Sequence, residues 1–260
     1  LGLIINPVAG VGGAVALKGS DDMAMHALAL GAEPKANARA QTALEVLQPY
    51  QGEITVYTVN DLMGEQTAKQ LGFPVELVYQ TEHAHTKADD TEQAVAALLA
   101  KQVDIILFAG GDGTARNIAK IVTEHADRSN QAQIPVLGIP AGCKIHSGVY
   151  AITPIAAGRV VELMVTKQLV TLTTGDIMDI DESLFREGVV KAKRFGEMQI
   201  PSELRYVQAV KSGGKESDEL VLQDISEDVM DNMGEESDSL FIVGSGSTTA
   251  FLMEELNLEN

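Results

Sequence analysis

The sequence has only one cysteine, few basic residues and no long apolar run. A single cysteine, Cys143, excludes a disulfide within the chain and is typical of a reducing compartment, so we expect a cytoplasmic protein. Lysine and arginine total 19 against 37 acidic residues, which gives a net charge of -18. Because such a chain repels nucleic-acid backbones and anionic membranes, we expect neither nucleic acid nor a membrane as a partner.

The apolar segments are short; one of the longest is Ala94–Ala100. Crossing a bilayer takes about 20 apolar residues, so no segment is expected to span a membrane. No basic stretch followed by an apolar one opens the sequence, so no signal peptide is visible. The rest of the composition is ordinary for a globular protein, with 45% hydrophobic and 22% charged residues. A length of 260 residues allows one large domain or two modest ones.

Short β-branched runs alternate with helical patterns over the first two thirds of the sequence. Several runs are apolar at every position, which is typical of strands buried on both faces of a parallel sheet. The predicted strands are LGLIIN (1–6), ITVYT (54–58), VELVY (75–79), DIILFA (104–109) and IPVLGI (134–139). Helical patterns lie around 38–47, 61–71, 91–101 and 117–124, the third with Asp90 as its predicted N-cap. The layout predicts an α/β fold with an N-terminal doubly wound, Rossmann-like domain.

The pattern changes after a predicted helix near 155–165. Three segments look like β structure without intervening helices: 169–181, 189–195 and 203–210. We therefore predict an α/β domain over residues 1–165 and a second, β-rich domain over 166–238. Residues 239–260 are predicted to form a strand, a glycine turn and a helix that pack on the first domain or along the seam. Since the sequence starts at Leu1 rather than Met and stops after this helix, we expect native residues to be missing at both ends.

The stretch LFAGGDGTARNIAKIV (107–122) carries most of the functional information. A strand ends, the chain turns at GGDG (110–113), and a helix is predicted to start near Thr114. Glycines allow a ligand to approach the backbone closely, and the N-terminus of a helix favours phosphate. Asp112 is the only charged residue in this turn, placed for a sugar hydroxyl or for Mg²⁺ beside a phosphate. The alternative is a tight turn whose aspartate merely caps the helix.

A second glycine-rich turn, INPVAGVGG (5–13), follows the first predicted strand. The first and fourth strands of a parallel sheet can be neighbours, so both turns are predicted to face one crevice. Neither turn reads GxGxxG with an acidic residue at the end of a second strand, which disfavours a nicotinamide dehydrogenase. Neither reads GxxxxGK[ST], which disfavours a P-loop nucleotidase. A third turn, GSGSTT (244–249), is either another phosphate cradle or a glycine turn with an N-cap.

These motifs together resemble a known superfamily. GGDGT (110–114), downstream of NPVAG (6–10) and upstream of GIPAGCKIHSGVYA (138–151), resembles the NAD kinase and diacylglycerol kinase superfamily. INPVAGVGG, LKGSDD (17–22) and PAGCKIHS (140–147) are most similar to its ATP-NAD kinase-like branch, which includes the acetoin-catabolism protein X group. The resemblance covers about residues 1–165, and GSGSTTAFL (244–252) is also similar. It implies an α/β domain, a β-rich second domain, and phosphoryl transfer from ATP with a divalent metal such as Mg²⁺.

The resemblance also implies roles for individual residues. Asp112 matches the superfamily's catalytic aspartate, which in NAD kinases accepts the proton of the ribose 2′-hydroxyl; it is also a candidate metal ligand. The segment PAGCKIHS points to Lys144, His146 and Ser147 as substrate-binding residues. Asp179 lies where NAD kinases carry an Asn-Glu-Val-type motif, which this sequence does not match cleanly. The residues expected to bind the nucleotide are those of the first two turns: Asn6, Pro7, Gly10, Gly12, Gly13, Gly110, Gly111, Gly113 and Thr114.

The sequence therefore predicts an ATP-dependent kinase that phosphorylates a hydroxyl of NAD or of a related small molecule. Backbone amides of the two turns would hold the phosphates, and Lys144 would add a positive charge. Superfamily members commonly self-associate, so a homo-oligomer is expected. Two alternatives stay open: a lipid kinase of the diacylglycerol or sphingosine type, and a non-catalytic nucleotide-binding accessory protein. The phosphoryl donor, ATP or polyphosphate, is open as well.

Replacing Asp112 by Asn tests the central assignment. The change keeps the size of the side chain and removes its charge, so the variant is expected to keep its fold and its nucleotide binding while losing most of its turnover. The measurement is phosphoryl transfer from labelled ATP, alongside calorimetric titration with ATP. Full activity of the variant would contradict a catalytic role for this residue.

Overall fold

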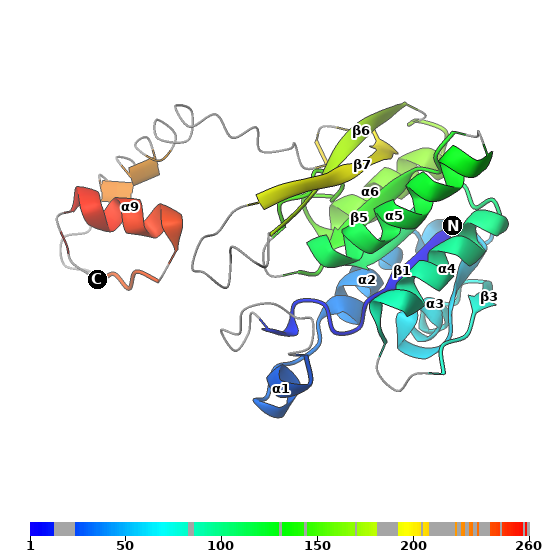
Figure 1. The fold of residues 1–260 in the computed structure, drawn as a ribbon, viewed down its shortest axis with the longest axis horizontal. Helices are drawn as coiled ribbons and strands as arrows, with labels where there is room; N and C mark the ends of the chain where they lie inside the picture. Colours follow the sequence, from blue (N-terminus) through cyan, green and yellow to red (C-terminus); the bar gives the residue numbers. More distant parts are fainter. Residues whose placement is uncertain are drawn as a thin grey trace. The chain divides into compact units, whose positions relative to one another are not determined.

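The computed structural model describes residues 1–12, 24–82, 86–129, 132–142, 145–169, 171–180, 192–203 and 205–207, together with parts of 222–258. The chain divides into two compact units, Leu1–Val210 and Lys211–Asn260. The first unit contains a parallel sheet flanked by helices and a separate antiparallel sheet (Figure 1). The second unit contains the helix α9 (Ser247–Glu255). Within the described residues, no helix combines the length and the apolar character needed to cross a membrane.

Five parallel strands form the main sheet, in the order β3-β2-β1-β4-β5. Their bounds are β1 (Gly2–Ile5), β2 (Val56–Val59), β3 (Val75–Tyr79), β4 (Ile106–Gly110) and β5 (Val136–Pro140). β1 and β4 are buried at every position, as their continuous apolar sequences predict. The two strands pair directly, with Ile5 opposite Ala109. Because the strand order reverses between them, their carboxyl ends form the switch point at which doubly wound sheets bind ligands.

Helices cover both faces of the parallel sheet, which confirms the doubly wound prediction. On one side, α2 (Ala36–Glu45) packs against α6 (Pro154–Val165) and α3 (Glu65–Gln70). On the other side, α4 (Ala88–Ala100) packs against α5 (Asp112–Ser129). Right-handed crossovers require this separation, because the connections run in opposite directions on either side of the reversal. The remaining short elements are α1 (Ala24–Ala29), η2 (Gln48–Tyr50) and η3 (Asp61–Met63).

Two helices begin earlier than the sequence predicts. α4 begins at Ala88, so Asp90 lies in its first turn rather than at its N-cap. The Asp90 carboxylate is buried, and it accepts hydrogen bonds from the backbone N–H of Lys87 (2.8 Å) and from the Tyr79 hydroxyl (3.1 Å). α5 begins at Asp112 rather than near Thr114. The carboxylate of Asp112 therefore belongs to the first turn of the helix, where the N–H groups have no partner within the helix.

The second sheet is a pair of antiparallel strands, β6 (Leu172–Ile180) and β7 (Ala192–Pro201). It packs against α5 and beside β5 (Figure 1). β6 agrees with the predicted segment 169–181, whereas β7 extends well beyond the predicted end at residue 195. The predicted strand 203–210 is wrong over its described part, because residues 205–207 form a turn that ends in an isolated bridge between Val207 and Ala151. Residues 240–244, predicted as a strand before α9, have no regular structure.

The side chain of Tyr150 places a polar hydroxyl group in the buried core. The ring packs over β5 at Gly138 and meets Phe108 of β4 edge-on, with the ring centroids 5.3 Å apart. Burial raises the pKa of Tyr150 well above its usual value, and the carboxylates of Asp112 and Asp179 raise it further. The side chain therefore stays neutral. Its hydroxyl oxygen is buried without a hydrogen-bond partner among the described residues.

Replacing Tyr150 by Phe is expected to leave the protein as stable or to stabilise it by about 1 kcal/mol, because the variant removes an unsatisfied buried polar atom. Tyr79 provides the matched control, since its hydroxyl does donate to Asp90. Tyr79→Phe is expected to destabilise by about 1 kcal/mol. Urea unfolding of both variants measures the difference. A loss of stability in Tyr150→Phe as large as in Tyr79→Phe would show that the Tyr150 hydroxyl is hydrogen-bonded.

Candidate functional site

Three loops meet at the carboxyl edge of the parallel sheet, after β1, β4 and β5. These strands are neighbours in the sheet, so their carboxyl ends lie side by side. Main-chain hydrogen bonds join the loops: Asn6 N–H donates to the carbonyl of Ala109 (2.9 Å). Ala141 N–H and Gly142 N–H both donate to the carbonyl of Gly110 (3.0 Å each). The first two turns therefore lie side by side at this edge, as expected of neighbouring strands, and the loop after β5 joins them.

The three loops approach so closely that glycine is required at their contacts. Gly10 has a φ of +77°, and a Cβ atom there would lie 2.3 Å from the carbonyl oxygen of Ala141. A Cβ atom on Gly142 would lie 2.8 Å from the Cα atom of Gly111. Both distances are too short for atoms that are not bonded to each other. Gly10 and Gly111, which were predicted to allow ligand approach, thus also let the backbones of the loops come close together.

Asn6 ties the first loop to the start of α5. Its Nδ2 donates to the Thr114 hydroxyl oxygen (3.1 Å), and its Oδ1 accepts from the backbone N–H of Val8 (3.2 Å). The side chains of Asn6 and Thr114 therefore bind each other, although both were predicted to face the nucleotide. Pro7 and Gly12 are buried in the same loop, and Gly113 is partly buried in the first turn of α5. Gly13 and Lys144 lie outside the described residues.

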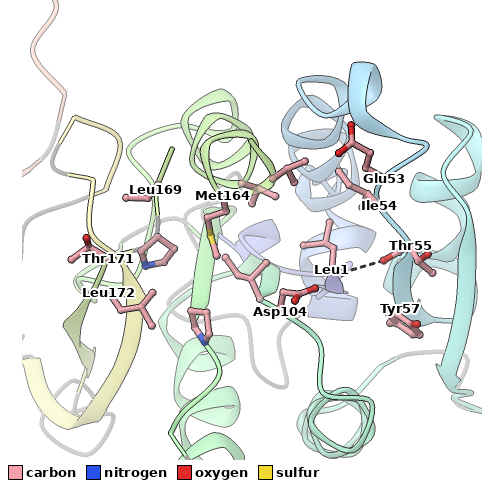
Figure 2. Close-up of a pocket in the computed structure, with 15 residues that line it drawn as sticks. Leu1, Glu53, Ile54, Thr55, Tyr57, Asp104, Met164, Leu169, Thr171 and Leu172 are labelled. Atoms are coloured by element: carbon pink, nitrogen blue, oxygen red, sulfur yellow. Dashed lines mark hydrogen bonds between the residues drawn. The ribbon is translucent and has the colours of Figure 1, made fainter. Parts of the chain in front are cut away.

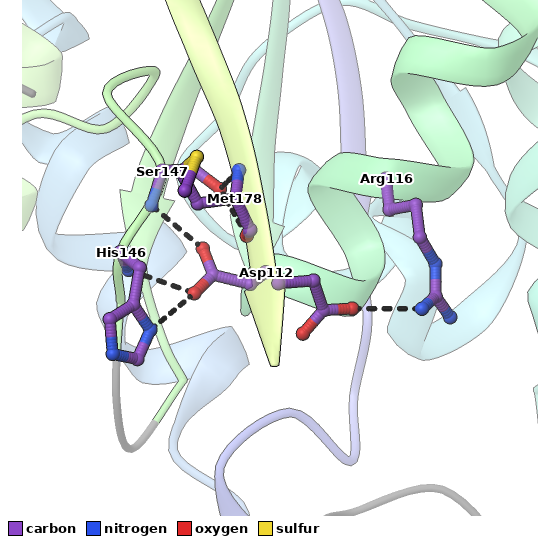
Figure 3. Close-up of polar contacts among 6 residues, drawn as sticks. Asp112, Arg116, His146, Ser147 and Met178 are labelled. Carbon is purple, nitrogen blue, oxygen red and sulfur yellow. Dashed lines mark hydrogen bonds and ion pairs between the residues drawn. The ribbon is translucent and has the colours of Figure 1, made fainter. Parts of the chain in front are cut away.

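The carboxylate of Asp112, in the first turn of α5, is bound by the loop after β5 (Figure 3). Its Oδ2 accepts from the backbone N–H of His146 (2.8 Å) and lies 3.1 Å from His146 Nδ1. Its Oδ1 accepts from the backbone N–H of Ser147 (3.1 Å). The side chain is only 5% exposed, against 33% for His146. The predicted residues Asp112, His146 and Ser147 thus form one hydrogen-bonded cluster, held at the N-terminus of α5.

Ser147 connects this cluster to the antiparallel sheet. Its hydroxyl donates to the carbonyl of Met178 (2.9 Å) and accepts from the N–H of the same residue (3.0 Å). Met178 lies in β6 at the irregularity in its pairing with β7. Because the hydroxyl binds both the N–H and the carbonyl of Met178, the serine helps to position β6 beside the loop after β5.

Asp179, the next residue of β6, lies in the same region but pairs with an arginine that the sequence analysis did not single out. Its Oδ2 lies 2.9 Å from Nη1 of Arg116, whose guanidinium also covers the ring of Phe195 at 5.4 Å. Arg116 follows Asp112 by one helical turn, so its position on the same face of α5 was a usable signal. Arg39 was also missed: its Nη1 donates to the carbonyl of Pro140 (2.6 Å) at the end of β5. Arg116 thus lies one turn into α5 from Asp112, and Arg39 lies beside the end of β5.

The described neighbours of the Asp112 carboxylate offer no ready-made set of metal ligands. Both hydrogen-bonding positions of Oδ2 are taken by N–H groups of His146, and Oδ1 is engaged by Ser147. No group of three or more His, Cys, Asp or Glu side chains is placed to hold a metal ion in the part of the chain that the structure describes. Mg²⁺ prefers several oxygen ligands in octahedral geometry. The donor set around Asp112 is instead that of an anion bound by amides.

A cavity of about 670 Å³ lies at the opposite edge of the sheet (Figure 2). Its walls include Thr55, Ile105 and Pro135, which directly precede the strands β2, β4 and β5. The carboxylates of Glu53 and Asp104 also line it. Ligands of doubly wound sheets bind at the carboxyl ends of the strands, and two carboxylates repel a triphosphate. This cavity is therefore separate from the candidate site.

The family model for the ATP-NAD kinase N-terminal domain matches residues 1–169. The chain belongs to the ATP-NAD kinase family. The match covers all three loops of the site and ends just before β6. It supports a kinase that acts on NAD-like substrates with ATP as the phosphoryl donor. A search of curated proteins gave no match, so the finer resemblance to the acetoin-catabolism protein X group stays a prediction.

In this ATP-NAD kinase family member, the close contacts between the loops are expected to be necessary for full nucleotide affinity. Gly10→Ala and Gly142→Ala force backbone apart, and Gly10→Ala adds the strain of a positive φ, so each is expected to destabilise by about 1–3 kcal/mol and to weaken ATP binding. Gly52→Ala is the matched control, because a Cβ atom there meets nothing within 4 Å. Thermal unfolding and calorimetric titration with ATP measure both effects. ATP affinity in Gly10→Ala and Gly142→Ala that equals the affinity of the Gly52→Ala control would contradict the role of these loops.

Proposed function

We propose that this protein is an ATP-dependent kinase that transfers a phosphoryl group to a hydroxyl of NAD, giving NADP when the 2′-hydroxyl is the acceptor, or to a related small molecule. The observation that carries the proposal is the position of Asp112: a carboxylate at the N-terminus of α5, between close-packed glycine loops at the sheet's switch point. Such a place combines an anion-binding helix end with a charged group that can act on a nearby hydroxyl.

Phosphoryl transfer depends on positioning and charge neutralisation more than on covalent chemistry. The first N–H groups of α5 and the loop after β1 supply the donors for the phosphates in this proposal. Lys144 adds a point charge from the loop after β5. Because no cluster of metal-binding side chains lies around Asp112 among the described residues, Mg²⁺ would be held mainly by the phosphate oxygens of ATP and would neutralise part of their charge.

The substrate is the finer part of the proposal. Residues 110–114 and 140–147 support kinase chemistry, whereas the position of Asp179 does not match the motif that holds the dinucleotide in NAD kinases. Its pairing with Arg116 is consistent with a structural role beside the site. A net charge of -18 argues against a lipid kinase working at an anionic membrane surface. We place the protein in the cytoplasm, as a homo-oligomer.

The test is phosphoryl transfer from labelled ATP with Mg²⁺ to NAD and to a panel of hydroxyl-bearing metabolites, with polyphosphate as an alternative donor. The expected result is transfer to NAD or to one member of the panel. Asp112→Asn is the matched control. Because an amide cannot accept from every N–H group that Asp112 binds, this variant is expected to lose about 1–3 kcal/mol of stability, so assays run well below its unfolding temperature.

The other outcomes separate the alternatives. Binding of ATP without transfer to any acceptor would identify an accessory protein and overturn the proposal. Transfer to diacylglycerol or sphingosine in liposomes, with firm co-sedimentation, would identify a lipid kinase.

A further inference from the structure

Arg39 and Arg116 occupy comparable positions on two helices that begin at the carboxyl edge of the parallel sheet. Arg39 lies in the first turn of α2, and Arg116 lies one turn after Asp112 in α5. The two helices cover opposite faces of the sheet. The charge of Arg116 is compensated by Asp179, whose Oδ2 lies 2.9 Å from Nη1 of the arginine. Arg39, by contrast, forms no ion pair with any carboxylate that the structure describes.

This makes Arg39 different from every other arginine in the described part of the chain. Its Nη1 donates to the carbonyl oxygen of Pro140 (2.6 Å), and its remaining N–H groups have no hydrogen-bond partner among the described residues. The side chain is partly buried. The arginines that do pair with a carboxylate are Arg116, Arg128, Arg159, Arg194 and Arg205. In a chain with 37 acidic residues, one guanidinium at the edge of the site is thus left available to an anion.

The stability of α2 does not explain the position of Arg39. The first turn of a helix is the positive end of its dipole, where a cation is unfavourable and a carboxylate is favourable. α2 has no acidic residue in its first turn, whereas α3, α4 and α5 each have one or more. Its N-cap residue is Lys35, which adds a second positive charge and makes no capping hydrogen bond. The start of α2 is therefore positive, although the whole chain carries a net charge of -18.

The hydrogen bond to Pro140 places the guanidinium beside the meeting point of the three loops. Pro140 is the last residue of β5. The next residue, Ala141, lies so close to the loop after β1 that a Cβ atom on Gly10 would be 2.3 Å from its carbonyl oxygen. Arg39 thus borders the glycine loops on the side of α2, whereas Asp112 borders them on the side of α5. The two opposite charges lie on either side of the proposed phosphate site.

We propose that the guanidinium of Arg39 binds the phosphates of ATP and gives the site its preference for a triphosphate over a monophosphate. This inference rests on the proposed function, in which Asp112 acts on the acceptor hydroxyl. The triphosphate then runs from the side of Asp112 across the glycine loops toward Arg39. A guanidinium binds phosphate oxygens through pairs of N–H groups. The hydrogen bond to Pro140 orients the group and leaves its other N–H groups for these oxygens.

The experiment measures, by calorimetric titration, the affinities of the full chain for ATP, ADP, AMP and NAD. Arg39→Ala is expected to weaken ATP binding about 10–100-fold, because it removes charge-assisted hydrogen bonds to phosphate. We expect a smaller loss for ADP and little change for AMP and NAD. Arg128→Ala is the matched control, since it removes the same charge from the last turn of α5, where Arg128 pairs with Glu124 (2.8 Å). This control is expected to bind all four ligands as the wild type does.

Arg39→Lys separates phosphate binding from the contact with Pro140. Lysine keeps the charge and a donor for the carbonyl but lacks the paired N–H groups, so its loss of ATP affinity is expected to be smaller than that of Arg39→Ala. If Arg39→Ala does not fold, Arg39→Lys is compared with the Arg128→Ala control in its place.

Three results would overturn the inference. The first is an ATP affinity in Arg39→Ala equal to that of the control. The second is an equal loss for ATP and AMP, which would show that Arg39 acts only by holding the loop after β5. The third is a loss confined to NAD, which would place the charge with the acceptor. Wild-type protein that binds no ATP would instead refute the proposed function itself.

Discussion

The structure depends on the hydrogen bonds that bind the Asp112 carboxylate. A buried carboxylate costs several kcal/mol unless donors replace its hydration, and here the donors come from His146 and Ser147, in a loop that follows a different strand. The charge therefore fixes that loop against the N-terminus of α5. Ser147 then uses its hydroxyl to bind Met178, so the position of β6 follows from the same contact. One charged group thus joins the parallel sheet, the helix and the antiparallel sheet.

The strand order makes this contact possible. β1, β4 and β5 are separate in the sequence but adjacent in the sheet, so three loops meet at one edge. The hydrogen bond between Asn6 and Thr114 spans 108 residues of sequence, and that between Asp112 and His146 spans 34. Both pairs join residues just beyond the ends of neighbouring strands. The close contacts at Gly10 and Gly142 show why these loops need bare backbone: any side chain there would separate the strands' ends.

Most of the parallel sheet could be predicted from the sequence, because strands that are buried on both faces have continuous apolar sequences. The switch point followed from the two glycine turns. The helix starts at Asp112 and Ala88 were missed, since a carboxylate in a first turn and one at an N-cap have the same local sequence pattern. The contact of Asp112 with His146 could not be predicted, because no local pattern reports which loops meet. The pair of Arg116 and Asp179 was missed for the same reason, as it joins α5 to a strand 63 residues further on.

An acidic chain that binds a triphosphate must attract it by short-range means. With a net charge of -18, the field of the whole molecule repels an anion, but salt screens that field beyond about 8 Å at physiological ionic strength. Inside that distance, the N-terminus of α5 offers N–H groups and a positive dipole end. The guanidinium of Arg116 is turned toward Asp179, and the charge of Asp112 is compensated by three N–H groups. In the proposed function, hydrogen bonds from the main chain and the single charges of Lys144 and Arg39 therefore supply the attraction, and they act only on a ligand already at the edge of the sheet.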